Sequence, residues 1–329
     1  MGTVSPTRIR LDRIEASAAA IDPVFLRTPQ FECEALGDVL GGRVTLKVET
    51  LNPIRSFKGR GASLFTAREA PDSPLVCASA GNFGQAMAYA CARRDVRLIV
   101  YASERANALK VERMRALGAE VRLEGDDFDA AKIAAKRFAA ERGVRMVEDA
   151  LEPATAEGAG TIALELIAGA SDFDAVLVPL GNGALLAGIA TVLAAHRPDV
   201  RVVAVQSRGA PAMVESLRSG RLVVGERIDT IADGIGVRIP IPEALADLDG
   251  LVDETILVEE SSIVAGMQLI HRHAGVVAEP SAAVGVAALL EAPQRYSGAH
   301  VVTIVCGGNL THDQAREWLF DPHEAVASA

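Results

Sequence analysis

Strand and helix patterns alternate along this chain at a regular spacing, most clearly from residue 75 onward. Short apolar runs rich in β-branched residues predict strands, and longer segments with apolar residues every three to four positions predict helices. This alternation is typical of a parallel sheet covered by helices. In the first block the strands are predicted at 75–79, 97–102 and 120–123, and the helices at 83–94, 107–117 and 128–142.

The same alternation continues to the C-terminus, and a strand over 44–48 followed by a helix over 61–69 precedes it. We therefore predict an α/β protein with two open, mostly parallel twisted sheets flanked by helices. Residues 1–73 and 148–329 form the large domain, residues 74–147 form a small βα domain, and one cleft lies between them. In the second block the strands are predicted at 175–180, 201–205 and 301–305, and the helices at 159–168, 184–196, 260–274 and 281–291.

Composition and charge narrow the classes of function. The chain has 329 residues, of which 50% are hydrophobic, so it can bury a large core. Its formal net charge of -10 argues against a nucleic-acid partner, since binding phosphate backbones requires a basic face. No run of 18 uncharged apolar residues indicates a membrane span, and the 4 cysteines lack C-x-x-C spacing. We expect a cytoplasmic protein that acts on a small molecule.

Lys58 is the candidate reactive residue. It follows a proline-led turn and stands at the start of a predicted helix, where backbone N–H groups favour negative charge. A lysine bonds covalently to an aldehyde only when its amine loses its proton, which burial or neighbouring positive charge promotes. We predict that Arg55 and Arg60 supply this charge and that Phe57 supplies an apolar wall. The alternative is a solvated lysine in a basic loop.

A second candidate is the strand-to-helix junction Ser79-Ala80-Gly81-Asn82-Phe83. Ligands in open α/β sheets bind where strands end and helices begin. This junction offers a hydroxyl, an amide, and a glycine that lets a ligand approach the backbone. Alternatively, it is an ordinary turn in which Ser79 or Asn82 caps the helix.

The next junction is Gly181-Asn182-Gly183-Ala184, which presents successive backbone N–H groups to a phosphate. A dinucleotide site would need G-x-G-x-x-G, but Leu186 stands where the last glycine belongs. No acidic residue ends the following strand either. A single phosphate group therefore fits better than a dinucleotide, and an unliganded tight turn is the alternative.

A third junction ends the strand at 301–305 with Cys306, followed by two glycines. Free cysteine is often a core residue. At a strand end, Cys306 can also face a ring nitrogen as a neutral partner, because a thiol does not supply the firm negative charge of an aspartate. Both interpretations stay open from the sequence.

Together these positions supply an amine, a phosphate cradle and partners for a ring oxygen and a ring nitrogen, which describes a site for pyridoxal 5'-phosphate (PLP). The sequence here resembles the threonine/serine dehydratases and serine racemases, PLP-dependent enzymes of the tryptophan synthase β-subunit fold (fold type II). The resemblance covers most of the chain. It rests on Ser56-Phe57-Lys58-Gly59-Arg60-Gly61-Ala62, Ser79-Ala80-Gly81-Asn82, Ala232-Asp233-Gly234, Glu279-Pro280 and Gly307-Gly308-Asn309.

The resemblance implies a role for each of these residues. Lys58 would carry the covalent link to PLP and then transfer protons, with Phe57 against the cofactor ring. Asn82 would bind the ring hydroxyl, Cys306 would face the ring nitrogen, and Glu279 would lie at the ring edge. The phosphate would lie on Gly181, Asn182, Gly183 and Ala184, and the substrate carboxylate on Ser79, Gly81, Asn82 and Phe83.

Two departures from the family pattern bear on the reaction. The racemases carry a serine where this chain has Ala80, as the dehydratases do. Racemisation needs a proton donor on each face of the substrate, so elimination is favoured. The position after Asn82, usually histidine, is Phe83, which leaves only a backbone donor and puts the usual small hydroxy-amino acid in doubt.

We therefore predict a PLP-dependent ammonia-lyase that converts a β-hydroxy-α-amino acid, such as threonine, serine or 3-hydroxyaspartate, to a 2-oxo acid and ammonia. The alternatives are a β- or γ-replacement synthase, an amino-acid racemase, and a non-catalytic module that binds a phosphate or nucleotide. Residues 205–212 replace two carboxylates that bind a cation in some members, so we expect no metal. The relatives also imply a homodimer.

Overall fold

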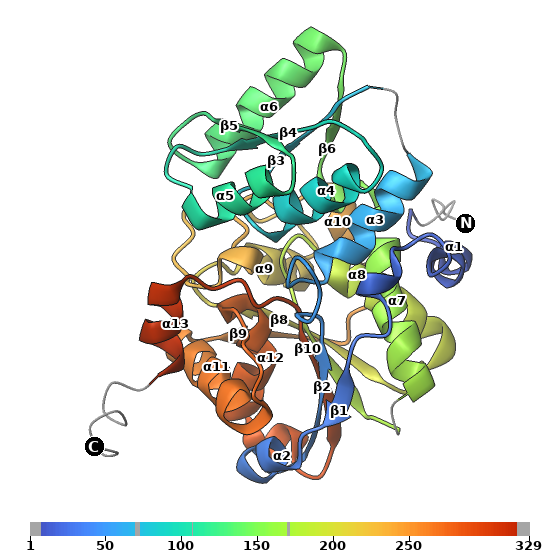
Figure 1. The fold of residues 1–329 in the computed structure, drawn as a ribbon. Helices are drawn as coiled ribbons and strands as arrows, with labels where there is room; N and C mark the ends of the chain where they lie inside the picture. Colours follow the sequence, from blue (N-terminus) through green and yellow to red (C-terminus); the bar gives the residue numbers. More distant parts are fainter. Residues whose placement is uncertain (1–7, 70–72, 107, 170–171, 321–329) are drawn as a thin grey trace.

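The computed structural model describes residues 8–69, 73–106, 108–169 and 172–320. Its larger sheet has the strand order β1-β2-β10-β7-β8-β9 (Figure 1). Strand β1 is antiparallel to β2, and the other neighbouring pairs are parallel. The strands are β1 (Gln30–Glu32), β2 (Arg43–Val48), β7 (Ala175–Pro179), β8 (Arg201–Ser207), β9 (Glu254–Val258) and β10 (His300–Val305).

The smaller sheet has the order β5-β4-β3-β6 and is entirely parallel. Its side chains alternate between two faces, as a strand requires. Leu75 and Cys77 pack with helices α3 and α4, whereas Val76 packs with α6 on the other side. The strands are β3 (Leu75–Ala78), β4 (Leu98–Ala102), β5 (Glu120–Leu123) and β6 (Arg145–Val147).

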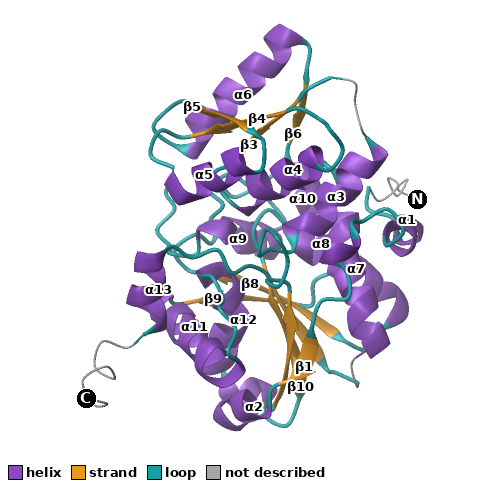
Figure 2. Cartoon of the chain, in the orientation of Figure 1, coloured by secondary structure: helices purple, strands orange, loops and turns teal. Residues whose placement is uncertain are grey.

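Helices cover both sheets, and several of them lie between the two sheets (Figure 2). The pair α7 and α8 and the pair α11 and α12 lie on either side of the larger sheet (Figure 1). The helices are α1 (Leu11–Ser17), α2 (Glu34–Leu40), α3 (Lys58–Arg68), α4 (Asn82–Ala92), α5 (Ala108–Ala116), α6 (Phe128–Arg142), α7 (Pro153–Gly169), α8 (Ala184–His196), α9 (Ala212–Ser219), α10 (Pro242–Ala246), α11 (Glu260–Ala274), α12 (Pro280–Glu291) and α13 (His312–Leu319).

The predicted fold class is confirmed, and the differences lie in short or edge elements. The helix predicted from residue 159 begins at Pro153, where a proline costs no hydrogen bond because the first turn has none to lose. Strand β9, at the edge of its sheet and half-buried, was missed, as were β1, β6, α2, α9, α10 and α13. Asn107, the predicted start of α5, lies outside the described residues. In the described part of the chain, no helix has the length and apolarity to cross a membrane.

Candidate active site

The loop before α3 holds Lys58 against the end of β10. The Asn52 side chain accepts a hydrogen bond from the N–H of Ile54 at 3.2 Å, which shapes the turn. The N–H of Phe57 donates to the carbonyl of Cys306 at 3.0 Å. This turn therefore places the first residue of α3 at the carboxyl edge of the larger sheet.

Glycines let neighbouring segments approach the start of α3 closely. A Cβ atom at Gly61 would lie 2.6 Å from Thr155 Cα on α7, and one at Gly158 would lie 2.7 Å from Gly61 Cα. A Cβ atom at Gly59 would overlap the ring of Phe25. Helix α3 thus packs on α7 backbone against backbone, and this contact helps to fix the position of Lys58.

The Lys58 amine lies between an aromatic ring and a carboxylate. Its Nζ forms an ion pair with Asp149 and lies 4.6 Å from the centre of the Phe57 ring. Asp149 opens the 3-10 turn η2 (Asp149–Leu151), which follows β6 closely and so comes from the smaller sheet. The sequence analysis missed Asp149, because no local pattern links it to a lysine 91 residues away.

The structure contradicts the prediction that Arg60 supplies positive charge to Lys58. Arg60 is completely buried and bonds the carboxylates of Glu49 and Glu165, with both oxygens of each within 2.9 Å of its nitrogens. Burial acts to lower the pKa of Arg60, but the two carboxylates outweigh it and raise that pKa. Its charge is compensated inside the protein, where Lys47 joins the same group through Glu165 at 2.7 Å.

Asn82 lies in a hydrogen-bonded group with Glu279 and Asn309. Asn82 Nδ2 donates to Glu279 Oε1 at 2.8 Å, and Asn309 Nδ2 donates to Asn82 Oδ1 at 2.8 Å. The N–H of Asn309 donates to Glu279 Oε2 at 3.0 Å. Burial, followed by the nearby charge of Asp233, raises the pKa of Glu279 to about 7. The structure thus joins the start of α4 to the residue that precedes α12.

Cys306 is buried next to this group. Burial, and to a lesser extent the charge of Glu279, raises the pKa of the Cys306 thiol, and Lys58 acts in the opposite direction. The thiol is therefore neutral near pH 7. A Cβ atom on the next residue, Gly307, would lie 2.6 Å from the Glu279 carboxyl carbon, so only glycine leaves room for that carboxylate.

Ser79 precedes helix α4, whose N-cap residue is Gly81, and its hydroxyl binds backbone N–H groups of this junction. Its Oγ accepts hydrogen bonds from the N–H groups of Gly81 at 3.2 Å and Gly84 at 3.1 Å. Apart from Gly81 and its two chain neighbours, no described residue has a heavy atom within 4 Å of the place where a Cβ atom of Gly81 would stand, so open space adjoins the backbone there. Phe83 is mostly buried and lines the same cleft as Ser79.

The glycine loop leads into α8, a helix of 13 residues. Gly183 has a φ of 96°, a left-handed conformation that favours glycine, and Ala184 is the first helical residue. Gly181 packs against the carbonyl of Gly234, 3.1 Å from where its Cβ atom would stand. Asn182 lines the cleft together with Asp149. The loop therefore presents a helix N-terminus next to the cleft.

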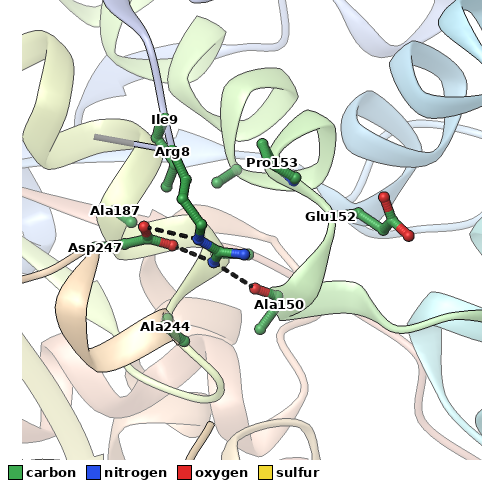
Figure 3. Close-up of a pocket in the computed structure, with 11 residues that line it drawn as sticks. Arg8, Ile9, Ala150, Glu152, Pro153, Ala187, Ala244 and Asp247 are labelled. Atoms are coloured by element: carbon green, nitrogen blue, oxygen red, sulfur yellow. Dashed lines mark hydrogen bonds and ion pairs between the residues drawn. The ribbon is translucent and has the colours of Figure 1, made fainter. Parts of the chain in front are cut away.

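A cleft of about 950 Å³ opens between the two parts of the molecule. Ser79, Phe83 and Asp149 line it from the smaller sheet's side, and Asn182 and Ile239 from the larger one's. Beside it lies a much smaller pocket, which Gly183 and Ala184 also line. In that pocket Arg8 bonds to Asp247 and to the carbonyl of Ala150, which braces η2 against α10 (Figure 3).

Hydrogen bonds and ion pairs also connect the two parts across the cleft. Lys110 on α5 contacts Asp233 at 2.6 Å, and Arg113 on the same helix donates to Asn309 at 2.8 Å. Asp233 and Asn309 belong to motifs that the sequence analysis quoted, although neither was among the predicted site residues. The sequence motifs therefore marked both residues, but their contacts with α5 could not be predicted without the fold.

These residues fit PLP. Lys58 offers an amine beside an aromatic ring, the start of α8 offers N–H groups for a phosphate, and Cys306 is a neutral group suited to an unprotonated ring nitrogen. In the described part of the chain, the buried hydroxyl of Ser281 has no hydrogen-bond partner. It lies next to Gly234, so a polar group of a ligand would satisfy it there.

The comparison with known proteins agrees with this fit. The family of pyridoxal-phosphate dependent enzymes matches residues 21–307, which is most of the chain. This chain belongs to the pyridoxal-phosphate dependent enzymes. As in that family, its cofactor is PLP.

The similar members of this PLP-dependent family act on amino acids. An L-threonine ammonia-lyase of Thermotoga maritima is 35% identical over 305 residues, which cover 92% of this chain and 76% of that one. Among solved structures, maize serine racemase has a TM-score of 0.88 at 27% identity, covering 94% of this chain and 96% of that one. Processed threonine deaminase isoform 2 from Solanum lycopersicum has a TM-score of 0.85 at 29% identity, with 95% and 94% covered.

Proposed function

We propose that this protein is a PLP-dependent ammonia-lyase that converts a β-hydroxy-α-amino acid to a 2-oxo acid and ammonia. The observation that carries the proposal is the Lys58 amine, which lies beside the Phe57 ring and pairs with Asp149, a residue of the cleft between the two parts of the molecule. Relatives named as threonine ammonia-lyases and dehydratases, at 31% identity and above, support elimination as the reaction.

In this proposal Lys58 anchors the cofactor and moves one proton. PLP, when bound, supplies an aldehyde carbon for a covalent link and a ring that withdraws electrons from the substrate. With PLP and substrate bound, the free Lys58 Nζ would accept the proton from the substrate α-carbon. The β-hydroxyl would leave as water with the proton that Lys58 has accepted, and the released enamine would hydrolyse to the 2-oxo acid and ammonia.

The other predicted site residues take their places around this step. We assign the substrate carboxylate to donors of Ser79, Gly81, Asn82 and Phe83 at the start of α4, next to the open space beside Gly81. The cofactor phosphate is assigned to Gly181, Asn182, Gly183 and Ala184, the ring hydroxyl to Asn82, and the ring surroundings to Phe57, Glu279 and Cys306.

Residue 80 favours elimination over racemisation. Racemisation requires a second group that exchanges a proton on the opposite face of the α-carbon. Ala80 has no such group. A racemase is nevertheless the second candidate, because the similar structures include maize serine racemase.

The division of the chain, its assembly and its compartment are part of the same proposal. All four strands of the smaller sheet lie within residues 74–147, which supports that segment as the small domain. The 4 cysteines are free, which supports a reducing compartment such as the cytoplasm. We also propose a homodimer, and light scattering of the purified protein tests it.

A substrate panel tests the proposed reaction. The protein loaded with PLP is incubated with both enantiomers of serine, threonine and 3-hydroxyaspartate, and ammonia and 2-oxo acid are measured. Release of both in equal amounts, without added nucleophile, is expected for at least one compound. A change in enantiomer ratio without ammonia release would instead indicate a racemase, and product formed only with an added nucleophile would indicate a replacement enzyme.

A further inference from the structure

We propose that Asp149 selects substrates whose side chain carries a second, positively charged nitrogen, such as β-hydroxy-α,γ-diamino acids. The inference rests on the proposed function and specifies its substrate class. Asp149 contacts the Lys58 amine and lines the cleft with Ser79, Phe83 and Asn182. Because Lys58 takes the substrate α-proton in the proposed function, a carboxylate paired with Lys58 would lie near the substrate.

The carboxylate of Asp149 has unused capacity to accept hydrogen bonds. Its Oδ2 pairs with Lys58, whereas its Oδ1 is buried and has no hydrogen-bond partner among the described residues. An ionised carboxylate without a partner is costly to bury. When the Lys58 nitrogen is engaged by the cofactor, Asp149 loses a partner on Oδ2 as well, and a cation supplied by the substrate would replace it.

The other cations that line the cleft are already paired. Lys132 and Lys136 both bond to Glu148, at 2.5 and 2.9 Å, and Arg238 pairs with Asp129. The cation that the structure pairs with Asp149 is Lys58, which stands behind the residues that line the cleft. The local charge at Asp149 favours a positive group over a neutral or an acidic one.

The remaining wall near Asp149 is largely apolar. Phe83, Met146 and Leu151 line the cleft on its side, and none of their side chains accepts a strong hydrogen bond. Glu148 also lines this side, but its carboxylate is already paired with Lys132 and Lys136, so a charged nitrogen on the substrate finds Asp149 as its acceptor. The substrate carboxylate goes to the N–H groups at the start of α4. Charge-assisted hydrogen bonds of this kind are among the stronger polar contacts in proteins.

The test compares two ligands without a β-hydroxyl, so that binding is measured rather than turnover. The PLP-loaded protein is titrated with 2,4-diaminobutyrate and with 2-aminobutyrate, and the visible spectrum of the cofactor reports binding. The wild type is expected to bind the diamino acid at least about tenfold more tightly, as one charged contact allows. Equal binding, or tighter binding of 2-aminobutyrate, would overturn the proposal.

Two variants separate a direct contact from a general charge effect. Asp149→Asn is expected to lose the preference and to bind 2-aminobutyrate much as before. Glu243→Gln removes the same charge elsewhere on the cleft wall and is expected to keep the preference. A preference retained in Asp149→Asn, or lost equally in both variants, contradicts a contact through Asp149.

The controls keep this proposal distinct from the proposed function. If Asp149→Asn does not take up PLP, Asp149→Ser replaces it in the comparison. If the wild type binds 2,4-diaminobutyrate no more tightly than 2-aminobutyrate, that result alone overturns the proposal. A protein with no cofactor spectrum at all would contradict the ammonia-lyase function. A normal spectrum without preference for the diamino acid would contradict only the role of Asp149.

Discussion

Replacing Arg60 with methionine should destabilise the protein strongly, although Arg60 does not line the cleft. The guanidinium bonds Glu49 and Glu165 and also two threonine hydroxyls, those of Thr28 and Thr161. Burial acts to raise the pKa of Glu165, but Arg60 and Lys47 outweigh it and lower that pKa to about 2. Glu165 is therefore ionised at neutral pH.

The expected cost follows from the charges that remain. Arg60→Met leaves Lys47 paired with Glu165, while Glu49, which is completely buried, keeps only the Thr28 hydroxyl. Removing one partner from a buried ion pair costs about 3–5 kcal/mol, because the other charge stays buried without compensation. Arg60→Lys should lower the free energy of unfolding less, since it keeps the charge and loses only the bidentate hydrogen bonds to the two carboxylates.

Chemical unfolding followed by far-UV circular dichroism measures this cost, from the midpoint and slope of the transition. Arg10→Met is a matched control, because Arg10 pairs with Asp12 on the surface and its loss should leave the midpoint nearly unchanged. The double variant Glu49→Gln with Arg60→Met should be more stable than Arg60→Met alone. A loss below about 1 kcal/mol in Arg60→Met would refute the account of this buried group.

Two further predictions follow from the site. Because the pKa of Glu279 is raised from 4.5 to about 7, the folded state keeps a proton that the unfolded chain loses in this range, so stability should fall as pH rises through it. The full loss of unfolding free energy is about 3 kcal/mol in the cofactor-free protein, and chemical unfolding curves recorded at a series of pH values measure it. Glu279→Gln should abolish this dependence of the unfolding free energy on pH. An unchanged dependence in Glu279→Gln would count against the raised pKa. Gly61→Ala should force α3 away from α7 and lower PLP uptake, which the visible spectrum measures. Gly225→Ala is the control, because a Cβ atom there meets only ordinary contacts, and it should not lower PLP uptake. Full uptake in Gly61→Ala would show that this packing does not position Lys58.

The sequence predicted those parts of the molecule whose signal is local. Strand β7, the glycine loop and helix α8 form one continuous pattern, and the predicted bounds of α8 and α6 match the structure. Gly183 takes the left-handed conformation at the helix start that such a loop needs. Local patterns of this kind depend on residues that are neighbours in the chain.

The rest depends on contacts between distant segments. Arg60 was predicted to act on Lys58 because the two are only two positions apart in sequence. The direction of the Arg60 side chain is instead set by Glu49 and by Glu165, 105 residues away. Asp149 follows β6, a strand of 3 residues that is too short to show a period. The sequence therefore could not predict Asp149 beside Lys58, because that contact depends on the fold.

The identity of the lysine that binds PLP tests the central claim most directly. The protein is loaded with PLP, reduced with borohydride to fix the covalent link, digested and analysed by mass spectrometry. We predict that the added mass lies on the peptide containing Lys58, and that Lys58→Ala gives neither this label nor turnover. A label on Lys47, Lys110, Lys132 or Lys136 with Lys58 unmodified, or full activity in Lys58→Ala, would contradict the account.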